Sequence, residues 1–68
     1  MWNAWIEQIF EAEAAKNGNL VRRKVADVNR MASVALLVEA VKRRNFHLIQ
    51  TGDQFVIVCN SGAIHLVA

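Results

Sequence analysis

Two histidines and one cysteine are the side chains of this 68-residue chain that could serve a metal site or nucleophilic catalysis: His47, His65 and Cys59. In the strand register that we prefer, the histidines share one face but stand two strands apart, with backbones about 9 to 10 Å from each other. That separation is awkward for ligands of one zinc ion, and the sequence supplies no third ligand. We therefore expect no metal site, and each imidazole more simply lies at the edge of an apolar face or in an interface.

Catalysis by Cys59 requires a base beside the thiol. The preferred register places Cys59 on the face opposite both histidines, and only a register slipped by one residue brings His47 near. Paired carboxylates and a glycine-rich phosphate loop are also absent. We interpret Cys59 as a small buried side chain, and expect a protein that is not an enzyme, with no catalytic residue and no cofactor.

Cationic side chains are concentrated in the middle of the chain. Residues 20–44 contain seven Lys and Arg residues and two acidic ones, an excess of five positive charges, although the net charge of the whole chain is only +2. Such a segment could contact phosphates. No aromatic residue is interleaved with the cations to stack on bases, so a solvated or self-complementary charged face is the preferred interpretation. The candidate phosphate contacts are Arg22, Arg23, Lys24, Arg30, Lys42, Arg43 and Arg44.

The length and composition of the chain predict one domain, 1–68, that associates with other molecules. A domain this small is only marginally stabilised by a single core. Hydrophobic residues make up 54% of the sequence, more than a globule of this size can bury, so we expect self-association. With one cysteine no internal disulfide can form, which favours the cytoplasm. No apolar run approaches the roughly 20 residues that span a bilayer, and no signal peptide is recognisable, so we expect a soluble protein without a membrane partner.

Alternating apolar and polar residues near the C-terminal end predict an antiparallel three-stranded meander. Its strands are 46–51, 54–60 and 63–67, separated by Gly52-Asp53 and Ser61-Gly62. Glycine accepts the positive φ that tight hairpin turns require. If both loops hold two residues, the pairs are Thr51 with Gln54, Ile49 with Val56, His47 with Val58, and Val58 with His65. A three-residue first loop would slip the register by one residue and exchange the faces.

Both faces of this meander are apolar near the centre, so we expect both to be covered. The face that we assign to the core carries Phe46, Leu48, Phe55, Ile57, Cys59, Ile64 and Leu66. The other face carries His47, Ile49, Val56, Val58, His65 and Val67. An antiparallel sheet that meets water on one side normally shows polar residues there. The second face is therefore a candidate contact surface.

Helical periodicity precedes the meander. Trp2, Trp5 and Ile9 belong to a stripe with the spacing of one helix face, which predicts a helix over residues 2–16 that stops at Asn17-Gly18. The aromatic stripe either lies in the core or packs against a second copy. Residues 20–25 are either a short strand with cations on an exposed edge, which we prefer, or the first turns of the next helix. A second helix is expected over 28–44 with Asp27 as its N-cap, covering the meander.

We therefore predict an α+β domain in the order α-β-α-β-β-β, with the C-terminal meander packed by helices. Its expected role is a non-enzymatic interaction module that forms a homodimer or a larger closed oligomer. An accessory nucleic-acid-binding protein that uses the basic segment 22–44 is one alternative. A small inhibitor or adaptor that binds another protein is a second alternative. The residues expected to mediate self-association are Trp2, Trp5, Ile9, Ile49, Val56 and Val58.

Overall fold

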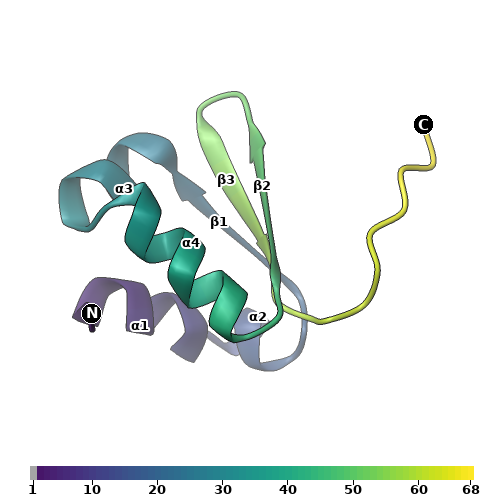
Figure 1. Cartoon of the computed structure of the whole chain (residues 1–68), viewed down its shortest axis with the longest axis horizontal. Helices are drawn as coiled ribbons and strands as arrows, with labels where there is room; N and C mark the ends of the chain where they lie inside the picture. Colours follow the sequence, from purple (N-terminus) through teal and green to yellow (C-terminus); the bar gives the residue numbers. More distant parts are fainter. Residues whose placement is uncertain (1) are drawn as a thin grey trace.

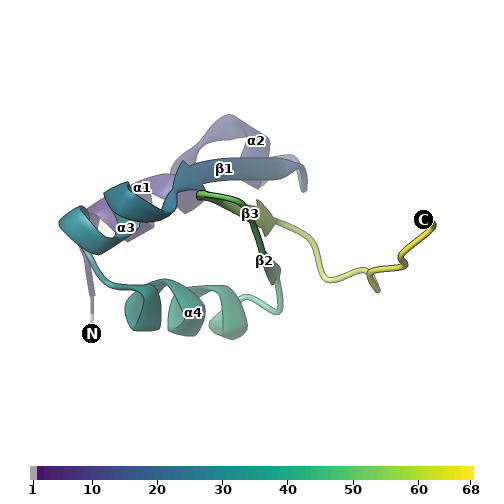
Figure 2. The same cartoon turned by 90° about the horizontal axis from the view of Figure 1, so that it is seen from above.

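The computed structural model of the chain describes residues 2–68, which fold into helices on one side of a small antiparallel sheet (Figures 1 and 2). The α+β class predicted from the sequence is confirmed, and the sheet has three strands in the order β1-β3-β2. The elements are α1 (Ala4–Glu11), α2 (Glu13–Lys16), β1 (Leu20–Lys24), α3 (Val25–Met31), α4 (Val34–Arg43), β2 (His47–Thr51) and β3 (Gln54–Val58).

The hairpin β2–β3 has the register predicted from the alternation. Thr51 pairs with Gln54, and the pairing then continues to His47 opposite Val58. The two-residue loop begins at Gly52, whose φ of 58° is unfavourable for residues with a Cβ. Of the two loop residues only Gly52 has a positive φ, which is the φ pattern of a type II′ turn. The glycine thus fixes the loop length, and the loop length fixes the register.

The third strand of the predicted meander is wrong. Residues 59–68 contain no strand and leave the sheet as an extended tail, drawn in yellow in Figure 1. The place beside β3 is taken by β1, which pairs antiparallel from Leu20 opposite Val58 to Lys24 opposite Gln54. A strand has only two edges, and β2 occupies the other one. The predicted core residues Ile64 and Leu66 are consequently 44% and 91% exposed.

The strand predicted for residues 20–25 is confirmed as β1, but the predicted first helix is divided in two. Ala12 interrupts it with an extended backbone, φ −59° and ψ 145°, between α1 and α2. The α1 helix begins after Asn3, whose Oδ1 accepts a hydrogen bond from the Ile6 amide at 3.0 Å. Gly18, with a φ of 76°, follows α2 and turns the chain into β1. No proline or glycine marks the break at Ala12 in the sequence.

The predicted second helix is also divided, because Ser33 caps a new helix in the middle of the expected span. Its Oγ accepts a hydrogen bond from the Leu36 amide at 3.1 Å, and Ala32 before it has a non-helical backbone. A serine at an N-cap satisfies one of the amides that a helix start leaves unpaired. Asp27 is therefore not the N-cap that we expected. It lies in the first turn of α3.

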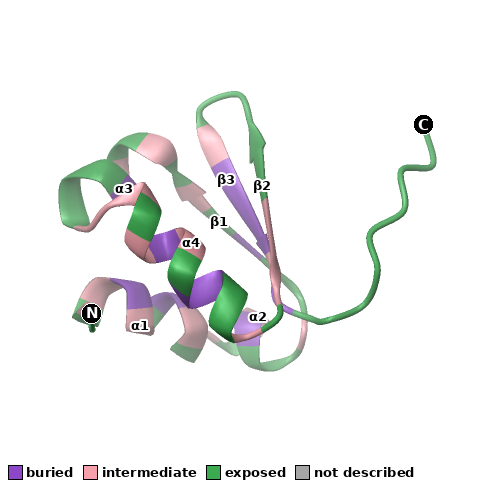
Figure 3. Cartoon of the chain, in the orientation of Figure 1, coloured by how far each residue is buried: buried purple, intermediate pink, exposed green. Residues whose placement is uncertain are grey.

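The core lies between the helices and one face of the sheet (Figures 2 and 3). Four large side chains are almost completely inaccessible, one each from α1, α3, α4 and β3: Ile9, Val28, Leu37 and Ile57. On α1, Trp5 and Phe10 are partly buried against this cluster. The strand face that contributes to it carries Val21, Phe55 and Ile57. The residues that alternate with these along the strands therefore point away from the helices.

Candidate functional site

The face of the sheet turned away from the helices is the most unusual surface of the domain, and we call it the open face. It consists of three cross-strand rows that run from β1 through β3 to β2. The rows are Leu20–Val58–His47, Arg22–Val56–Ile49 and Lys24–Gln54–Thr51. The open face is thus apolar at one end and polar and cationic at the other. No helix of the described residues 2–68 covers it (Figure 2).

Large apolar side chains are exposed on the open face. Leu20 is 50% exposed and Ile49 is 41% exposed, while Val58 between the outer strands is half-buried. Val56 is only 8% exposed, yet it does not belong to the cluster under the helices. Arg22 and Ile49 flank Val56 directly and shield it from solvent. We had expected both faces to be covered, and within one chain the helices cover only one of them.

The two outer strands leave different backbone groups unpaired. In β2, the turn geometry pairs Thr51 with Gln54, and alternation then directs the amides and carbonyls of Leu48 and Gln50 outwards. In β1, the 3.1 Å hydrogen bond from the Cys59 amide to the Asn19 carbonyl shows which alternate residues direct their backbone groups toward β3. The backbone groups of Leu20, Arg22 and Lys24 consequently point outwards there. Each edge could accept a further strand on geometry alone.

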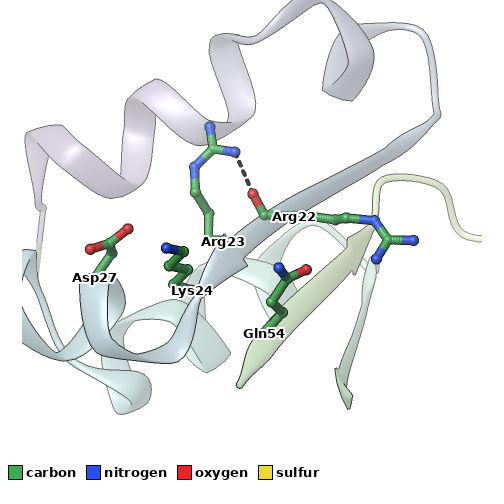
Figure 4. Close-up of a pocket in the computed structure, with 5 residues that line it drawn as sticks. All are labelled: Arg22, Arg23, Lys24, Asp27 and Gln54. Carbon is green, nitrogen blue, oxygen red and sulfur yellow. Dashed lines mark hydrogen bonds between the residues drawn. The ribbon is translucent and has the colours of Figure 1, made fainter. Parts of the chain in front are cut away.

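The β1 edge is protected against further pairing. Arg23 folds back and donates from Nη1 to the outward carbonyl of Arg22 at 2.7 Å, as the dashed line in Figure 4 shows. Three consecutive cations, completed by Lys24, would also repel another chain of the same kind. These are two of the ways in which natural sheets avoid pairing edge to edge. The free edge of β1 is thus a poor acceptor.

The β2 edge has no such protection. Its five residues include no Lys, Arg, Asp or Glu, and the chain contains no proline. A groove of about 380 Å³ lies beside this edge, between the strand and α4. Its lining is mainly apolar and includes Val38 and Phe46, with Lys42 at the rim and Ile64 from the tail. An uncharged edge beside an apolar groove is suited to accept an extended segment.

The candidate phosphate contacts do not form one patch. Arg22, Arg23 and Lys24 line a shallow pocket of about 250 Å³ on β1, together with Asp27 and Gln54 (Figure 4). Two others, Lys42 and Arg43, are exposed at the C-terminal end of α4, at the opposite end of the domain from Lys24 (Figure 1).

Two further candidate phosphate contacts are engaged within the chain. Arg30 forms an ion pair with Asp27 at 3.2 Å on the surface. Arg44 forms a half-buried ion pair with Glu7 at 3.3 Å and donates to the Ala40 carbonyl at 3.0 Å. The role of Arg44 is therefore to join α4 to α1. The sequence could not indicate this contact, because Glu7 and Arg44 are 37 residues apart.

The histidines and the cysteine do not come together in a reactive arrangement. His47 lies at the start of β2, and its Nε2 is 2.6 Å from the Gly62 carbonyl, whereas His65 lies in the exposed tail. The alignment that we expected across Val58 is absent because residues 63–67 do not join the sheet. Cys59 is buried and free, and its burial raises the pKa of the thiol despite the opposing charge of Arg44. Among residues 2–68, no cluster of His, Cys, Asp and Glu suits a metal ion.

The residues predicted for self-association lie on two opposite sides of the domain. Ile49, Val56 and Val58 share the open face, whereas α1 packs on the helical side. Trp2, which precedes α1, is 71% exposed, whereas Trp5 on α1 is half-buried against the core. Ile9 is 1% exposed, so its side chain is used entirely within its own chain. Leu20 is a member of the open face that the prediction missed, although it lies two residues before Arg22 and therefore on the same face of a strand.

Comparison of the chain with protein-family models, with curated protein sequences and with solved structures gives no match. No helix among the described residues has the length and apolar character that crossing a membrane requires.

Proposed function

We propose that this chain is a small non-enzymatic interaction module that self-associates, as a homodimer or larger closed oligomer, through the open face. The observation that carries the proposal is the exposure of two large apolar side chains there, Leu20 and Ile49. Val56 and Val58 of the central strand lie between them, so four apolar side chains adjoin. Covering a half-exposed side chain of this size contributes roughly 1 kcal/mol. A second copy placed on the open face would cover all four.

The charge gradient along the open face limits how two copies can meet. Arg22 and Lys24 lie toward one end, and like charges in direct contact across a sheet are destabilising. An arrangement that overlaps the apolar ends and turns the cationic ends away from each other avoids this repulsion. Packed sheets of this kind keep their strand directions within about 30° of alignment and lie about 10 Å apart.

The test compares Ile49→Asp with Thr51→Asp, because both residues lie on the open face of β2 and are exposed. The first change places a carboxylate in the apolar centre of the proposed contact, and the second places it at the polar end. Sedimentation velocity over a concentration series should show association that Ile49→Asp weakens at least about 10-fold. Thr51→Asp should have a much smaller effect, and both variants should unfold at a denaturant concentration close to that of the unchanged chain.

A chain that stays monomeric up to millimolar concentration would contradict self-association. The open face would then be better explained by the alternative of an inhibitor or adaptor that binds a different protein. Association that both variants leave intact would instead place the contact elsewhere on the surface. We also propose a reducing location, the cytoplasm, because the one cysteine is a free and buried thiol.

Nucleic-acid binding is the second candidate, and one arrangement in the fold favours it. α3 and α4 are joined by the short connection Ala32-Ser33, and a β-hairpin follows them (Figure 1). In helix-turn-helix proteins the second helix of such a pair enters the major groove. The exposed residues of α4 are Ala35, Glu39, Lys42 and Arg43. Lys and Arg at one end of the helix suit phosphates, but this helix exposes no Asn or Gln, and Glu39 is repelled by the phosphate backbone.

A fluorescence anisotropy titration with duplex DNA at two salt concentrations tests this second candidate. Binding to phosphates must weaken steeply as salt is raised. If α4 is the contact, a Lys42→Ala, Arg43→Ala double variant should weaken binding, and an Arg22→Ala, Lys24→Ala double variant should not. The reverse outcome would assign binding to the pocket on β1. Absence of salt-dependent binding would exclude phosphate recognition by either group.

A further inference from the structure

The tail that follows β3 contains a segment with the sequence of a strand, but this segment pairs with no strand of its own chain. Residues 63–67 alternate in a β-like pattern without charge or proline, which is why they were predicted to join the sheet. In the structure the tail runs away from the domain in both views (Figures 1 and 2). Leu66 is 91% exposed and Val67 is 96% exposed. Two adjacent apolar side chains in this position stay exposed unless another surface covers them.

The first residues after β3 tie the tail to its own domain: the Cys59 amide donates to the Asn19 carbonyl at 3.1 Å, and Asn60 Nδ2 donates to the Gly18 carbonyl at 3.1 Å. The Gly62 carbonyl is held by His47 Nε2 at 2.6 Å, and Ile64 reaches the groove between β2 and α4. Beyond Ile64 the tail leaves the groove, whose remaining lining is apolar and includes Val38 and Phe46. The groove is thus only partly filled by the chain to which it belongs.

The β2 edge next to this groove offers what a strand requires. Leu48 and Gln50 direct their amides and carbonyls outwards, and no charged side chain guards the edge. A strand added there would place every second side chain in the groove and the others toward the open face. Applied to the end of the tail, this alternation places Leu66 in the groove and Val67 on the side of Ile49. Neither β2 nor residues 63–68 contain a Lys, Arg, Asp or Glu that would oppose the pairing.

We propose that the end of the tail, residues 66–68, adds as a short strand to the β2 edge of a second copy, with Leu66 in that copy's groove, so that two copies exchange tails. This inference rests on the proposed self-association and assigns it a second set of contacts. The Gly62 carbonyl is held by its own chain, so residues 63–65, about 10 Å long when extended, must cross to the second copy. Two sheets packed face to face lie about 10 Å apart, and residues 66–68 then cover about 10 Å of the roughly 17 Å length of β2.

The test combines one tail variant with a measurement on the acceptor edge. Leu66→Asp should weaken dimerisation at least about 10-fold, because full burial of a leucine is worth between one and two powers of ten. Ala68→Asp adds the same charge at the last position and should weaken it far less. Neither variant should change the denaturant midpoint of the dilute monomer, since Leu66 contributes little to the core of its own chain.

Hydrogen exchange followed by NMR supplies the second measurement. The amides of Leu48 and Gln50 should exchange slowly at concentrations where the chain is dimeric and quickly where it is monomeric. Leu66→Asp should remove that protection. If these amides are protected equally at all concentrations, the tail pairs within its own chain, and the proposed exchange of tails between copies is wrong. If Leu66→Asp dimerises normally while Ile49→Asp does not, the open face alone mediates association. If no variant and no concentration reveals a dimer, the proposed function itself fails.

Discussion

The guanidinium carbon of Arg44 lies 4.0 Å from the centroid of the Phe10 ring, and the same side chain forms an ion pair with Glu7. Phe10 and Glu7 are one turn apart on α1, whereas Arg44 directly follows α4. The arginine thus combines a cation–π contact with a charged hydrogen bond on one helix surface. These contacts join α1 to the end of α4, where the side chains of Arg44 and Glu7 are 27% and 25% exposed.

Replacing Arg44 by methionine should therefore reduce the stability of the domain without affecting phosphate binding. Methionine keeps an apolar stem over Phe10 but loses the cation–π contact and the hydrogen bonds to Glu7 and Ala40. We expect the free energy of unfolding in urea to fall by about 1 to 2 kcal/mol. Arg43→Met is the matched control, since Arg43 is exposed beside it, and it should cost less than about 0.5 kcal/mol. Equal effects of the two changes would contradict the structural role of Arg44.

Asn45 is the one described residue other than glycine with a positive φ, 57°. It ends α4: its amide donates to the Lys42 carbonyl at 3.0 Å, and the next amide, of Phe46, donates to the Val41 carbonyl at 3.1 Å. This is the hydrogen-bond pattern of a left-handed helix cap. Asn45→Ala should lower the free energy of unfolding by about 1 kcal/mol, because a Cβ without a local hydrogen bond is strained there.

Asn45→Gly should have the opposite sign or no effect, since glycine adopts positive φ freely. Thermal unfolding of the two variants side by side measures this difference. Because neither side chain would take part in the core, a loss of stability from Asn45→Gly as large as that from Asn45→Ala would show that the asparagine side chain, rather than its backbone conformation, stabilises the cap.

Because of Cys59, the free energy of unfolding of the domain should fall at alkaline pH. Burial raises the pKa of its thiol above the ordinary value of 9.0, with the charge of Arg44 opposing part of that shift. Above about pH 9 the unfolded chain therefore loses its thiol proton before the folded chain does. The folded state then binds more protons, so the free energy of unfolding falls as pH rises through this range. Below about pH 9 the contribution of the protonated thiol is fully present.

The measurement compares the unchanged chain with Cys59→Ala in urea at several pH values from about 8 to 10.5. Lysine titration affects both proteins equally, so the difference in free energy of unfolding isolates the thiol. That difference should be constant up to about pH 9 and then shrink as the thiolate forms in the unfolded state. A difference that grows with pH would mean that the folded protein stabilises the thiolate.

Local patterns in the sequence were sufficient for the hairpin but not for the complete sheet. Gly52 fixes a two-residue loop, and the register from Thr51 to Val58 follows from it. The choice between β1 and residues 63–67 as the third strand is decided by packing. β1 places Val21 in the core at 5% exposure, next to Ile57, and the Gly18 turn delivers it there. Alternation alone carries no information on such long-range competition.

The sequence likewise predicted one part of the candidate site and missed another. Alternation identified Ile49, Val56 and Val58 as a second apolar face of the sheet. The predicted meander already placed residues 46–51 at an edge of the sheet, as in the structure. The protection of the other edge could not be inferred, because it depends on β1 rather than residues 63–67 pairing with β3. The helix stripe was misleading for Ile9, since the same spacing serves a core and an interface, and only packing separates the two. Ser33 was a usable helix-start signal that the continuous apolar run around it obscured.

The two tryptophans provide a last prediction, which separates the open face from α1 as the association surface. Trp2 is 71% exposed at the start of α1, and Trp5 is half-buried against the core, both on the helical side. Trp2→Ser should change neither the free energy of unfolding nor the dimerisation constant by more than about 0.5 kcal/mol. Trp5→Ser should cost about 2 kcal/mol or more of stability, because it leaves a cavity beside Ile9 and its neighbours.

Fluorescence quenching tests whether the open face or α1 mediates association without relying on measurements of stability. In Trp5→Phe the only tryptophan is Trp2, and its emission should be quenched by iodide as strongly in the dimer as in the monomer. In Trp2→Phe the remaining Trp5 should be quenched weakly in both states. If dimerisation instead shields Trp2 from iodide, or if Trp2→Ser disperses the dimer, then α1 mediates association and the open face does not.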